Sequence, residues 1–260
     1  MKDSFFIAGR PLLLAHRGAS GHAPELTMAA FRSAETMQAD GCELDVQLSA
    51  DAHIAVFHDD TLSRTTGQPG ALANRRWSEL QELDAGGWFA PPFAGERIPD
   101  LEQILGAGPA DWRLDIELKK TLTPQRLAER VAEEIRQEKR PGRLIFTSFD
   151  RETLEHLAVQ LPGVRLGLIF AGDWPADHEL ERWPVWSVEQ HLVTRERLQQ
   201  ARARRIKVCV WTVNTVAAML HQFALGVDAI ITNYPDRYHQ AREIFSTGMQ
   251  NSLDLMEKNI

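Results

Sequence analysis

Short apolar segments alternate with helical segments along most of this chain of 260 residues, and the alternation limits the folds that the chain can adopt. Strands that are buried on both faces of a parallel sheet are aliphatic and β-branched runs of this kind. Since helices separate most of the runs, the chain is built from repeated β-α units. The predicted strands are 12–16, 42–47, 53–58, 112–118, 143–148, 164–169, 185–188, 206–212 and 228–232.

The helical segments lie between these strands, and no change in composition divides the chain. Residues 100–105 open with Asp100 and Gln103 in the spacing of a capping box. The pattern predicts one domain with a parallel sheet, most simply a (β/α)8 TIM barrel. An open doubly wound sheet is the alternative, although no G-x-G-x-x-G motif follows the first strand. The other predicted helices are 27–38, 124–139, 150–160, 194–204 and 215–225.

Nine predicted strands exceed the eight positions of a barrel, and the short connection 48–52 accounts for one of them. It is too short for a parallel crossover, so we expect an antiparallel hairpin here. A two-residue turn would place Asp45 opposite His58, and a slip of two residues would place Glu43 there instead. In either register the three side chains share one face of the hairpin, whereas a three-residue loop would break this arrangement.

A second strand has one polar face and one aliphatic face. The polar face of the segment WRLDIELKK carries Arg113, Asp115, Glu117 and Lys119. Barrel strands tolerate polar side chains inside only near the mouth, so these carboxylates and those of the hairpin should converge on one interior site. They would repel each other without a cation, and oxygen ligands suit Mg²⁺ or Ca²⁺.

Each of these polar features has an ordinary explanation when it is taken alone. Alternating charges often mark the solvated face of an antiparallel sheet, and a single histidine such as His16 is usually packed or hydrogen-bonded. The segment His58-Asp59-Asp60 could cap a turn. Their common position at strand ends favours an active site, because barrel enzymes take their catalytic groups from these ends.

The composition excludes several kinds of partner. A net charge of −7 and a pI near 5.7 provide no basic face for nucleic acid or an anionic membrane. No apolar run reaches the ~20 residues of a membrane span, and the N-terminal residues do not resemble a signal peptide. Cys42 and Cys209 lack metal-type spacing and are interpreted as buried thiols in a reducing compartment. We expect a cytoplasmic protein with no nucleic-acid partner and no stable membrane association; the oligomeric state stays open.

Several motifs follow one another between about residue 12 and residue 237. They are AHRGASGHAPELTMAAF, GCELDVQLSADAHIAVFHDDTLSRTT, LDAGGWFAPPFAGERIPDLEQIL, LDIELK, FTSFD, VWTVN and GVDAIITNYPD. In this order they resemble the motifs of the glycerophosphodiester phosphodiesterase family, cytosolic bacterial type, within the barrel-fold phosphodiesterases. The paired His-Arg and Glu-x-Asp blocks are the most specific part of the resemblance.

The resemblance implies the residues of the site. His16 and His58 match the two catalytic histidines of the family. Glu43, Asp45 and Glu117 match the ligands of one divalent cation, Mg²⁺ or Ca²⁺. The implied activity is metal-dependent hydrolysis of small-molecule glycerophosphodiesters to sn-glycerol 3-phosphate and an alcohol.

Two cations and one aromatic residue complete the predicted site. By resemblance, Arg17 and Lys119 contact the phosphate, where they would stabilise the charge that develops on its oxygens. Trp211 has the parity of an interior residue and is expected to form a wall of the substrate site. Two imidazoles suit the roles of general acid and general base. Either water or the 2-hydroxyl of the substrate could be the nucleophile.

The chain departs from the family pattern at three positions. Leu26 stands where the family usually has Asn, which affects the shape of the first loop. Asn233 stands where the family usually has Asp. In the strand segment VWSVEQH, Glu189 and His191 stand where the family commonly has Asn-Pro or a similar polar pair, and we expect the Glu189 side chain to be exposed.

The resemblance also predicts the organisation of the chain. Residues 1–243 should form the catalytic barrel, in which 59–98 are an inserted subdomain that covers the glycerol moiety. Residues 244–260 carry no motif and should form a marginal helix or a disordered tail. Two other functions stay open: cleavage of lysophospholipid headgroups by the same fold, and a barrel that binds phosphodiesters without cleaving them.

Overall fold

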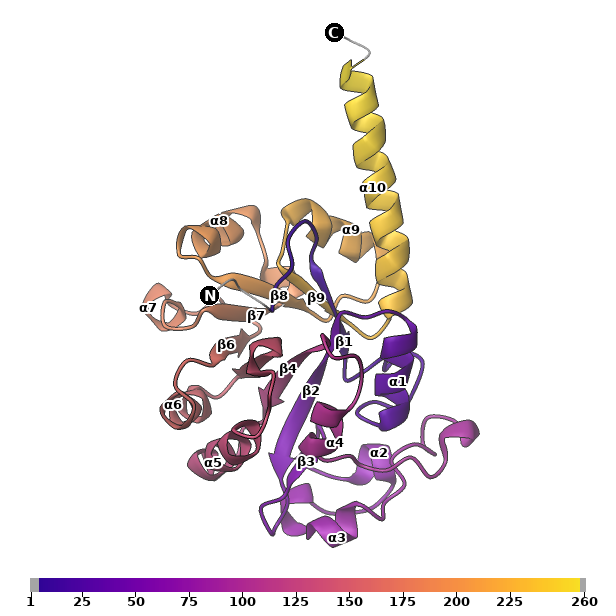
Figure 1. The fold of residues 1–260 in the computed structure, drawn as a ribbon, viewed down its shortest axis with the longest axis vertical. Coiled ribbons are helices and arrows are strands. Elements are labelled where there is room, and N and C mark those ends of the chain that lie inside the picture. The colour runs from indigo at the N-terminus through magenta and orange to yellow at the C-terminus, as the bar shows by residue number, and fades with distance from the viewer. Residues whose placement is uncertain (1–4, 258–260) are drawn as a thin grey trace.

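The computed structural model describes residues 5–257 and contains a closed barrel of parallel strands with helices around it (Figure 1). This confirms the (β/α)8 prediction. The strands are β1 (Leu12–His16), β2 (Gly41–Leu48), β3 (Ile54–Val56), β4 (Arg113–Leu118), β5 (Leu144–Ser148), β6 (Arg165–Phe170), β7 (Val185–Glu189), β8 (Lys207–Trp211) and β9 (Ala229–Thr232).

The barrel follows the order of the sequence, with β3 outside it. Each strand from β4 to β9 pairs in parallel with the next, and β1 closes the ring by pairing with both β9 and β2. β3 instead pairs antiparallel with the last residues of β2. All eight barrel strands therefore present their C-terminal ends at one mouth, where a site of the predicted kind has to lie.

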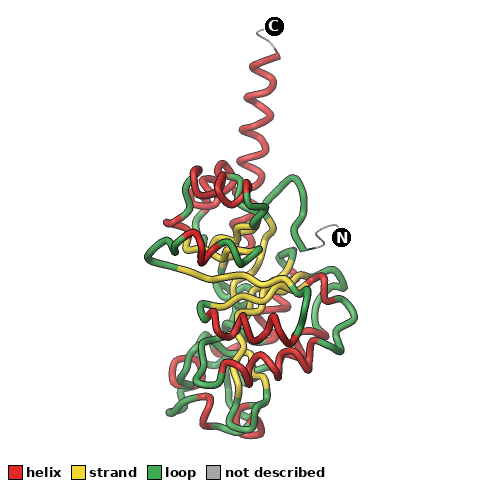
Figure 2. The backbone as a smooth tube through the Cα atoms, turned by 90° about the vertical axis from the view of Figure 1, so that its left-hand side faces the viewer, coloured by secondary structure: helices red, strands yellow, loops and turns green. Residues whose placement is uncertain are grey.

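The helices surround the barrel, and α10 (Pro235–Glu257) extends well beyond it (Figure 2). Asp100 and Gln103 form the predicted capping box at the start of α4 (Leu101–Gly106). The helices are α1 (Met28–Thr36), α2 (Ser63–Thr66), α3 (Trp77–Leu80), α4 (Leu101–Gly106), α5 (Pro124–Ile135), α6 (Arg151–Gln160), α7 (Asp177–Leu180), α8 (Arg195–Ala203), α9 (Val216–Leu225) and α10 (Pro235–Glu257). The short 3-10 helices are η1 (Leu72–Asn74), η2 (Pro91–Phe93), η3 (Pro141–Arg143) and η4 (Gln190–Leu192).

The hairpin forms, but the predicted register is wrong. Val46 pairs with Val56, and the backbone nitrogen of Phe57 donates to the carbonyl oxygen of Asp45, so Phe57 and not His58 lies opposite Asp45. The cause is a three-residue loop, 50–52, whose last residue, Ala52, has a φ of 61°. Loops of this length commonly end in a left-handed residue. His58 lies beyond the end of β3, where the pleat of the hairpin no longer sets its direction.

Residues 59–98, which we predicted to be an inserted subdomain, contain α2, η1, α3 and η2. Apolar residues of this segment form a buried cluster with Ala55 and Phe57 of the hairpin. Trp77 stacks on His53 of the hairpin with ring centroids 4.3 Å apart. The structure has no boundary at residue 244, since α10 is continuous from Pro235 to Glu257. The predicted tail therefore continues a helix of the barrel as far as the described residues reach.

The interior of the barrel changes from apolar to polar along its axis. At the N-terminal end, Phe5 is fully buried and packs edge-to-face against Phe6, with ring centroids 5.1 Å apart. Both rings close this end of the barrel, which leaves the other end for polar groups. The inward-facing residues of the same cluster are Leu12, Leu14, Ile145, Val185, Cys209, Ala229 and Ile231.

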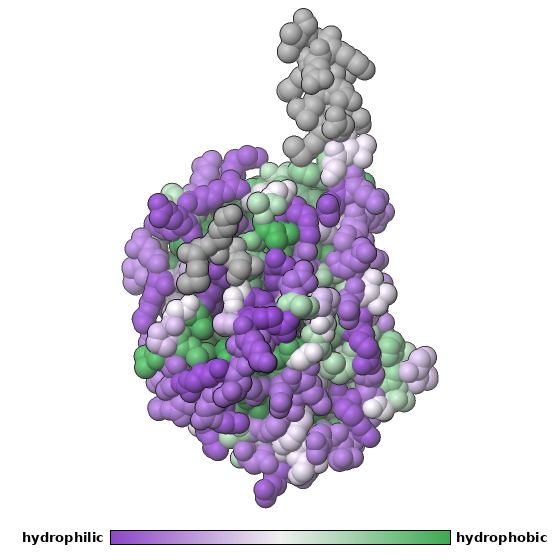
Figure 3. All heavy atoms as spheres, in the orientation of Figure 1, coloured by the Kyte–Doolittle hydropathy of each residue, from purple (hydrophilic) through white to green (hydrophobic). Residues whose placement is uncertain are grey.

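The outer surface is mainly hydrophilic on the face that Figure 3 shows, where hydrophobic residues occupy small areas. None of the described helices is long and apolar enough to cross a membrane. Cys42 and Cys209 are both buried free thiols, as predicted.

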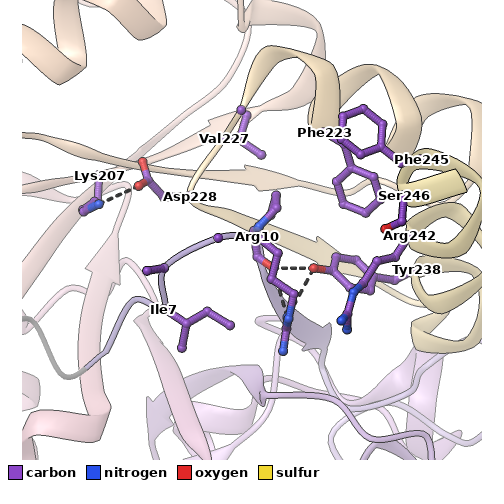
Figure 4. A pocket seen from close by; sticks show the side chains of 14 residues that line it. Ile7, Arg10, Lys207, Phe223, Val227, Asp228, Tyr238, Arg242, Phe245 and Ser246 are labelled. Carbon is purple, nitrogen blue, oxygen red and sulfur yellow. Dashed lines mark hydrogen bonds and ion pairs between the residues drawn. The ribbon is translucent and has the colours of Figure 1, made fainter. Parts of the chain in front are cut away.

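A cavity of about 740 Å³ lies at the N-terminal end of the strands, between residues 7–11 and α10 (Figure 4). Two of its cations are paired within the chain. Arg10 lies 2.6 Å from Asp40, and Lys207 lies 2.7 Å from Asp228. This cavity is at the end of the barrel opposite the predicted site residues.

We expect Phe5→Ala to lower the free energy of unfolding by about 3–5 kcal/mol, because it leaves a cavity in a closed apolar cluster. Chemical denaturation would measure the loss. Val159→Ala is the control, since Val159 is 77% exposed and should change stability little. A similar small loss for both variants would contradict the role of Phe5 in closing the barrel.

Glu134 on α5 predicts a pH dependence of stability. Burial, and then the charges of Asp100 and Glu102, raise its pKa to about 7. A carboxyl group with a raised pKa in the folded state stabilises the fold fully below its unfolded pKa, and this contribution is lost as pH rises through 7. As pH rises from 4.5 to 7, the wild type loses this contribution and Glu134→Gln does not. The free energy of unfolding of Glu134→Gln should therefore rise relative to that of the wild type, by roughly 1–3 kcal/mol over this range.

Urea denaturation at several pH values would measure this difference. Glu152→Gln, at an exposed position on α6, is the matched control. A constant difference between Glu134→Gln and the wild type across this range would contradict the prediction.

Candidate active site

The C-terminal ends of the strands enclose a pocket of about 180 Å³. All but one of the predicted site residues line it, and the exception, Asp45, lies in the carboxylate cluster at its edge. The predicted residues that line the pocket are His16, Arg17, Glu43, His58, Glu117, Lys119 and Trp211. The sequence therefore identified residues that the fold brings together from β1, β2, β4, β8 and the segment after β3.

Three carboxylates form the centre of the site. Glu43, Asp45 and Glu117 each offer an oxygen within 4.8 Å of the others. They meet because β2 and β4 pair in register, with Asp45 beside Glu117, and because side chains two residues apart share a face. Burial raises the pKa of Glu43 well above its ordinary value and that of Glu117 to about 7, and neighbouring carboxylates add to both rises.

These carboxylates fit a divalent cation. Both oxygens of Asp45 are buried and accept no hydrogen bond within the chain. Burying carboxylate oxygens that accept no hydrogen bond costs free energy, and a hard cation that prefers oxygen ligands would offset this cost. The donor set thus suits Mg²⁺ or Ca²⁺ better than a softer metal.

Arg17 and Lys119 face the carboxylates from two sides. Arg17 Nε and Lys119 Nζ each lie 3.4 Å from an oxygen of Asp45, and Lys119 Nζ lies 2.7 Å from Glu117. Both cations line the pocket with 17% of their side chains exposed, so a bound anion could reach them. Arg17 has a positive φ of 56°, which directs the chain from β1 into the first loop.

His16 is held by a residue from the other end of the chain. Its Nδ1 donates to Asn233 Oδ1 at 2.6 Å, and its Nε2 lies 3.8 Å from Glu43. Burial, and then the charge of Arg17, lower the pKa of His16 to about 4. The departure at 233 therefore gives His16 an amide partner, which fixes the tautomer without a negative charge.

His58 has a carboxylate partner instead. Its Nδ1 donates to Asp59 Oδ1 at 2.7 Å. Hydrogen bonds from Arg64 and His58 lower the pKa of Asp59 to about 2, against the opposing effect of burial. Since Nδ1 of each histidine is engaged, Nε2 is the ring nitrogen that each can offer to a substrate.

Asp115 is a fourth buried carboxylate of the pocket. The strand pattern predicted that it faces the interior site, but we assigned it no role there. Thr147 donates to its Oδ1 at 2.6 Å, while Oδ2 has no partner. Burial raises its pKa to about 7. The signal was present in the polar face of LDIELK, since Asp115 lies two residues before Glu117 and shares its face.

Two departures from the family pattern have a physical explanation. Leu26 adopts a positive φ of 57°, a conformation that Asn tolerates better than Leu, but its side chain is 3% exposed and joins the core. Glu189 is half-buried instead of exposed as predicted, because it accepts a hydrogen bond from the backbone of Gly172 at 3.1 Å. It does not line the pocket.

The wall opposite the carboxylates is apolar. Trp211 and Phe149 pack edge-to-face with ring centroids 5.9 Å apart, and Ile169 and Ile231 extend the same wall. The pocket therefore has one charged side and one apolar side, an arrangement that suits a small ligand with an anionic group.

Residues 16–237 match the glycerophosphoryl diester phosphodiesterase family. The chain belongs to this family. A glycerophosphodiester phosphodiesterase from Caldanaerobacter subterraneus is 33% identical over 234 residues, which cover 87% of this chain and 96% of that relative. The resemblance that the motifs suggested is thus confirmed.

Two further similar proteins have a stated ligand or activity of their own. A phosphodiesterase from Oleispira antarctica, solved in complex with the product sn-glycerol-3-phosphate, superposes with a TM-score of 0.85 at 29% identity and covers 90% of this chain and 97% of its own. A mouse lysophospholipase D is 26% identical over 274 residues, which cover 90% of this chain and 86% of the mouse protein.

We expect millimolar Mg²⁺ or Ca²⁺ to raise the melting temperature of the wild type and to raise that of Asp45→Asn much less. A cation that binds only the folded state stabilises it, by about 2.7 kcal/mol at 100 times the dissociation constant. Thermal melts in EDTA and in each cation measure the effect. Asp173→Asn removes an exposed carboxylate and is the control; equal shifts in the wild type and in Asp45→Asn would argue against the site.

Proposed function

We propose that this chain hydrolyses glycerophosphodiesters to sn-glycerol 3-phosphate and an alcohol, with one divalent cation, Mg²⁺ or Ca²⁺, and with His16 and His58 as general acid and base. The observation that carries the proposal is that two oriented imidazoles line one pocket beside a cluster of three carboxylates. Family membership and the product bound to the Oleispira antarctica relative support the substrate class.

The charged side of the pocket would bind the phosphodiester. A divalent cation held by Glu43, Asp45 and Glu117 would supply positive charge to the phosphoryl oxygens. Arg17 and Lys119 add two further cations, and the guanidinium can contact two oxygens at once. Trp211 on the apolar side would contact the organic part of the substrate.

The two histidines would move the protons. One imidazole accepts the proton of the nucleophile at Nε2, and the other protonates the departing alcohol. In-line displacement at phosphorus needs these groups on opposite sides of the phosphate, and His16 and His58 reach the pocket from different segments, β1 and the loop after β3.

We also propose that residues 59–98 cover the glycerol moiety of the substrate and that the protein acts in the cytoplasm on small molecules. The position of Asp59 and Arg64 next to His58 supports the first point. The acidic net charge of −7 supports the absence of nucleic-acid and membrane partners.

His16→Ala and His58→Ala should each lower kcat to less than about a tenth of the wild-type value, because a general acid or base contributes 10²–10⁴-fold. The metal-induced rise in melting temperature should remain in both. His156→Ala, on the outer helix α6, is the matched control. A kcat above a tenth in either variant would reject its catalytic role.

One assay separates this function from its alternatives. Release of glycerol 3-phosphate from glycerophosphocholine, glycerophosphoethanolamine and glycerophosphoglycerol is measured with and without EDTA, and lysophosphatidylcholine is tested alongside. Cleavage of the lysolipid alone would favour headgroup cleavage, which the mouse relative makes the second candidate. Binding of all substrates without cleavage would indicate a non-catalytic barrel.

The same assay tests the nucleophile. A substrate whose 2-hydroxyl is methylated can still be attacked by water, but it cannot close a cyclic phosphate. We propose the intramolecular route, because a neighbouring hydroxyl has a large effective concentration. Turnover of the methylated substrate at the normal kcat would show that water is the nucleophile.

A further inference from the structure

A continuous series of charged contacts joins the two sides of the pocket through the subdomain 59–98. Its central member is Arg64, which lies on the short helix α2 of this subdomain. Arg64 contacts two carboxylates that belong to different parts of the chain, Asp59 at the start of the subdomain and Glu25 in the first loop of the barrel. Neither carboxylate is a predicted metal ligand.

Arg64 uses its whole guanidinium group in these contacts. Nε and Nη2 donate to the two oxygens of Asp59 at 2.6 and 2.9 Å. Nη1 and Nη2 donate to the two oxygens of Glu25 at 2.8 and 2.7 Å. Two bidentate contacts of this kind fix both carboxylates in one plane, which a lysine with a single nitrogen cannot do.

Each of the two carboxylates also holds a residue of the proposed active site. Asp59 accepts from Nδ1 of His58 at 2.7 Å, and Glu25 accepts from Nη1 of Arg17 at 3.0 Å. A single carboxylate therefore links Arg64 to His58, the proposed acid or base, and another links it to Arg17, the proposed phosphate ligand.

The two carboxylates in this series of contacts are more buried than the arginine that joins them. The side chains of Glu25 and Asp59 are 13% and 22% exposed, whereas that of Arg64 is 43% exposed. The carboxylates are thus largely shielded from water, and the Arg64 guanidinium donates two hydrogen bonds to each of them. Arg17 also faces Asp45 at 3.4 Å, so without Glu25 it would turn towards the carboxylate cluster.

We propose that Arg64 is a positioning residue that orients His58 through Asp59 and Arg17 through Glu25 at the same time. The inference rests on the function proposed above. It gives residues 59–98 a role in catalysis that requires no contact between Arg64 and the substrate. Small displacements of reacting groups reduce rates strongly, so loss of this double contact should reduce catalysis.

Kinetics of Arg64→Ala and Arg64→Lys test the proposal. Both variants should lower kcat/KM by about 10- to 100-fold, the usual effect of removing a group that orients an active-site residue. Lysine keeps the charge but not the two forks, so it should restore little. Arg75→Ala is the control, because Arg75 lies in the same segment and contacts the exposed Glu79 and the carbonyl oxygen of Pro69, each at 3.4 Å.

Double mutants separate the effect of Arg64 through Asp59 from its effect through Glu25. In an Asp59→Asn background, Arg64→Ala should no longer lower kcat, and in a Glu25→Gln background it should no longer raise KM. Effects that simply multiply in both backgrounds would overturn the proposal. Thermal melts show whether any variant is unfolded, and if Arg64→Ala is, Arg64→Lys is used in its place.

A spectroscopic measurement separates this inference from the proposed function. In the wild type at pH 8, the ¹⁵N signals of His58 should show a single neutral tautomer protonated at Nδ1, and in Arg64→Lys they should show a mixture. An unchanged tautomer would overturn the role of Arg64. If the wild type cleaves no glycerophosphodiester, the proposed function fails, and this measurement alone decides the orienting role.

Discussion

Repulsion among buried carboxylates at the mouth of the barrel is the interaction on which the site depends. Glu43, Asp45 and Glu117 lie on two paired strands, so their proximity follows from the register of β2 and β4. Burying such charges without compensation would cost several kcal/mol for each ion. Arg17 and Lys119 supply part of the compensation, and the buried oxygens of Asp45 that accept no hydrogen bond mark where a further cation fits.

The two histidines show how one site can hold the same side chain in two environments. Asn233 orients His16 through a neutral amide, whereas Asp59 orients His58 through a carboxylate that Arg64 holds ionised. Both arrangements engage Nδ1 and leave Nε2 for the substrate. The difference lies in charge, and it arises because one partner comes from the closing strand of the barrel and the other from the subdomain.

The strand pattern predicted much of the site for a simple reason. Side chains alternate along a strand, so carboxylates at 43 and 45 and at 115 and 117 must share faces wherever the strands lie. His58 was identified as a site residue although the register argument for it was wrong. The three-residue loop that ends in Ala52 shifts the pairing by one, and a single sequence does not distinguish it from a two-residue turn.

The sequence by itself determined the β-α order, the polar faces and the family motifs, because these depend on local periodicity and residue type. Only the tertiary structure decided which groups hold the site residues in place. The contact of His16 with Asn233 spans 217 positions and exists because β1 and β9 close the barrel. The contact of Arg64 with Glu25 depends on the path of the subdomain across the first loop. Such contacts result from many packing interactions together, so no local pattern of residues specifies them.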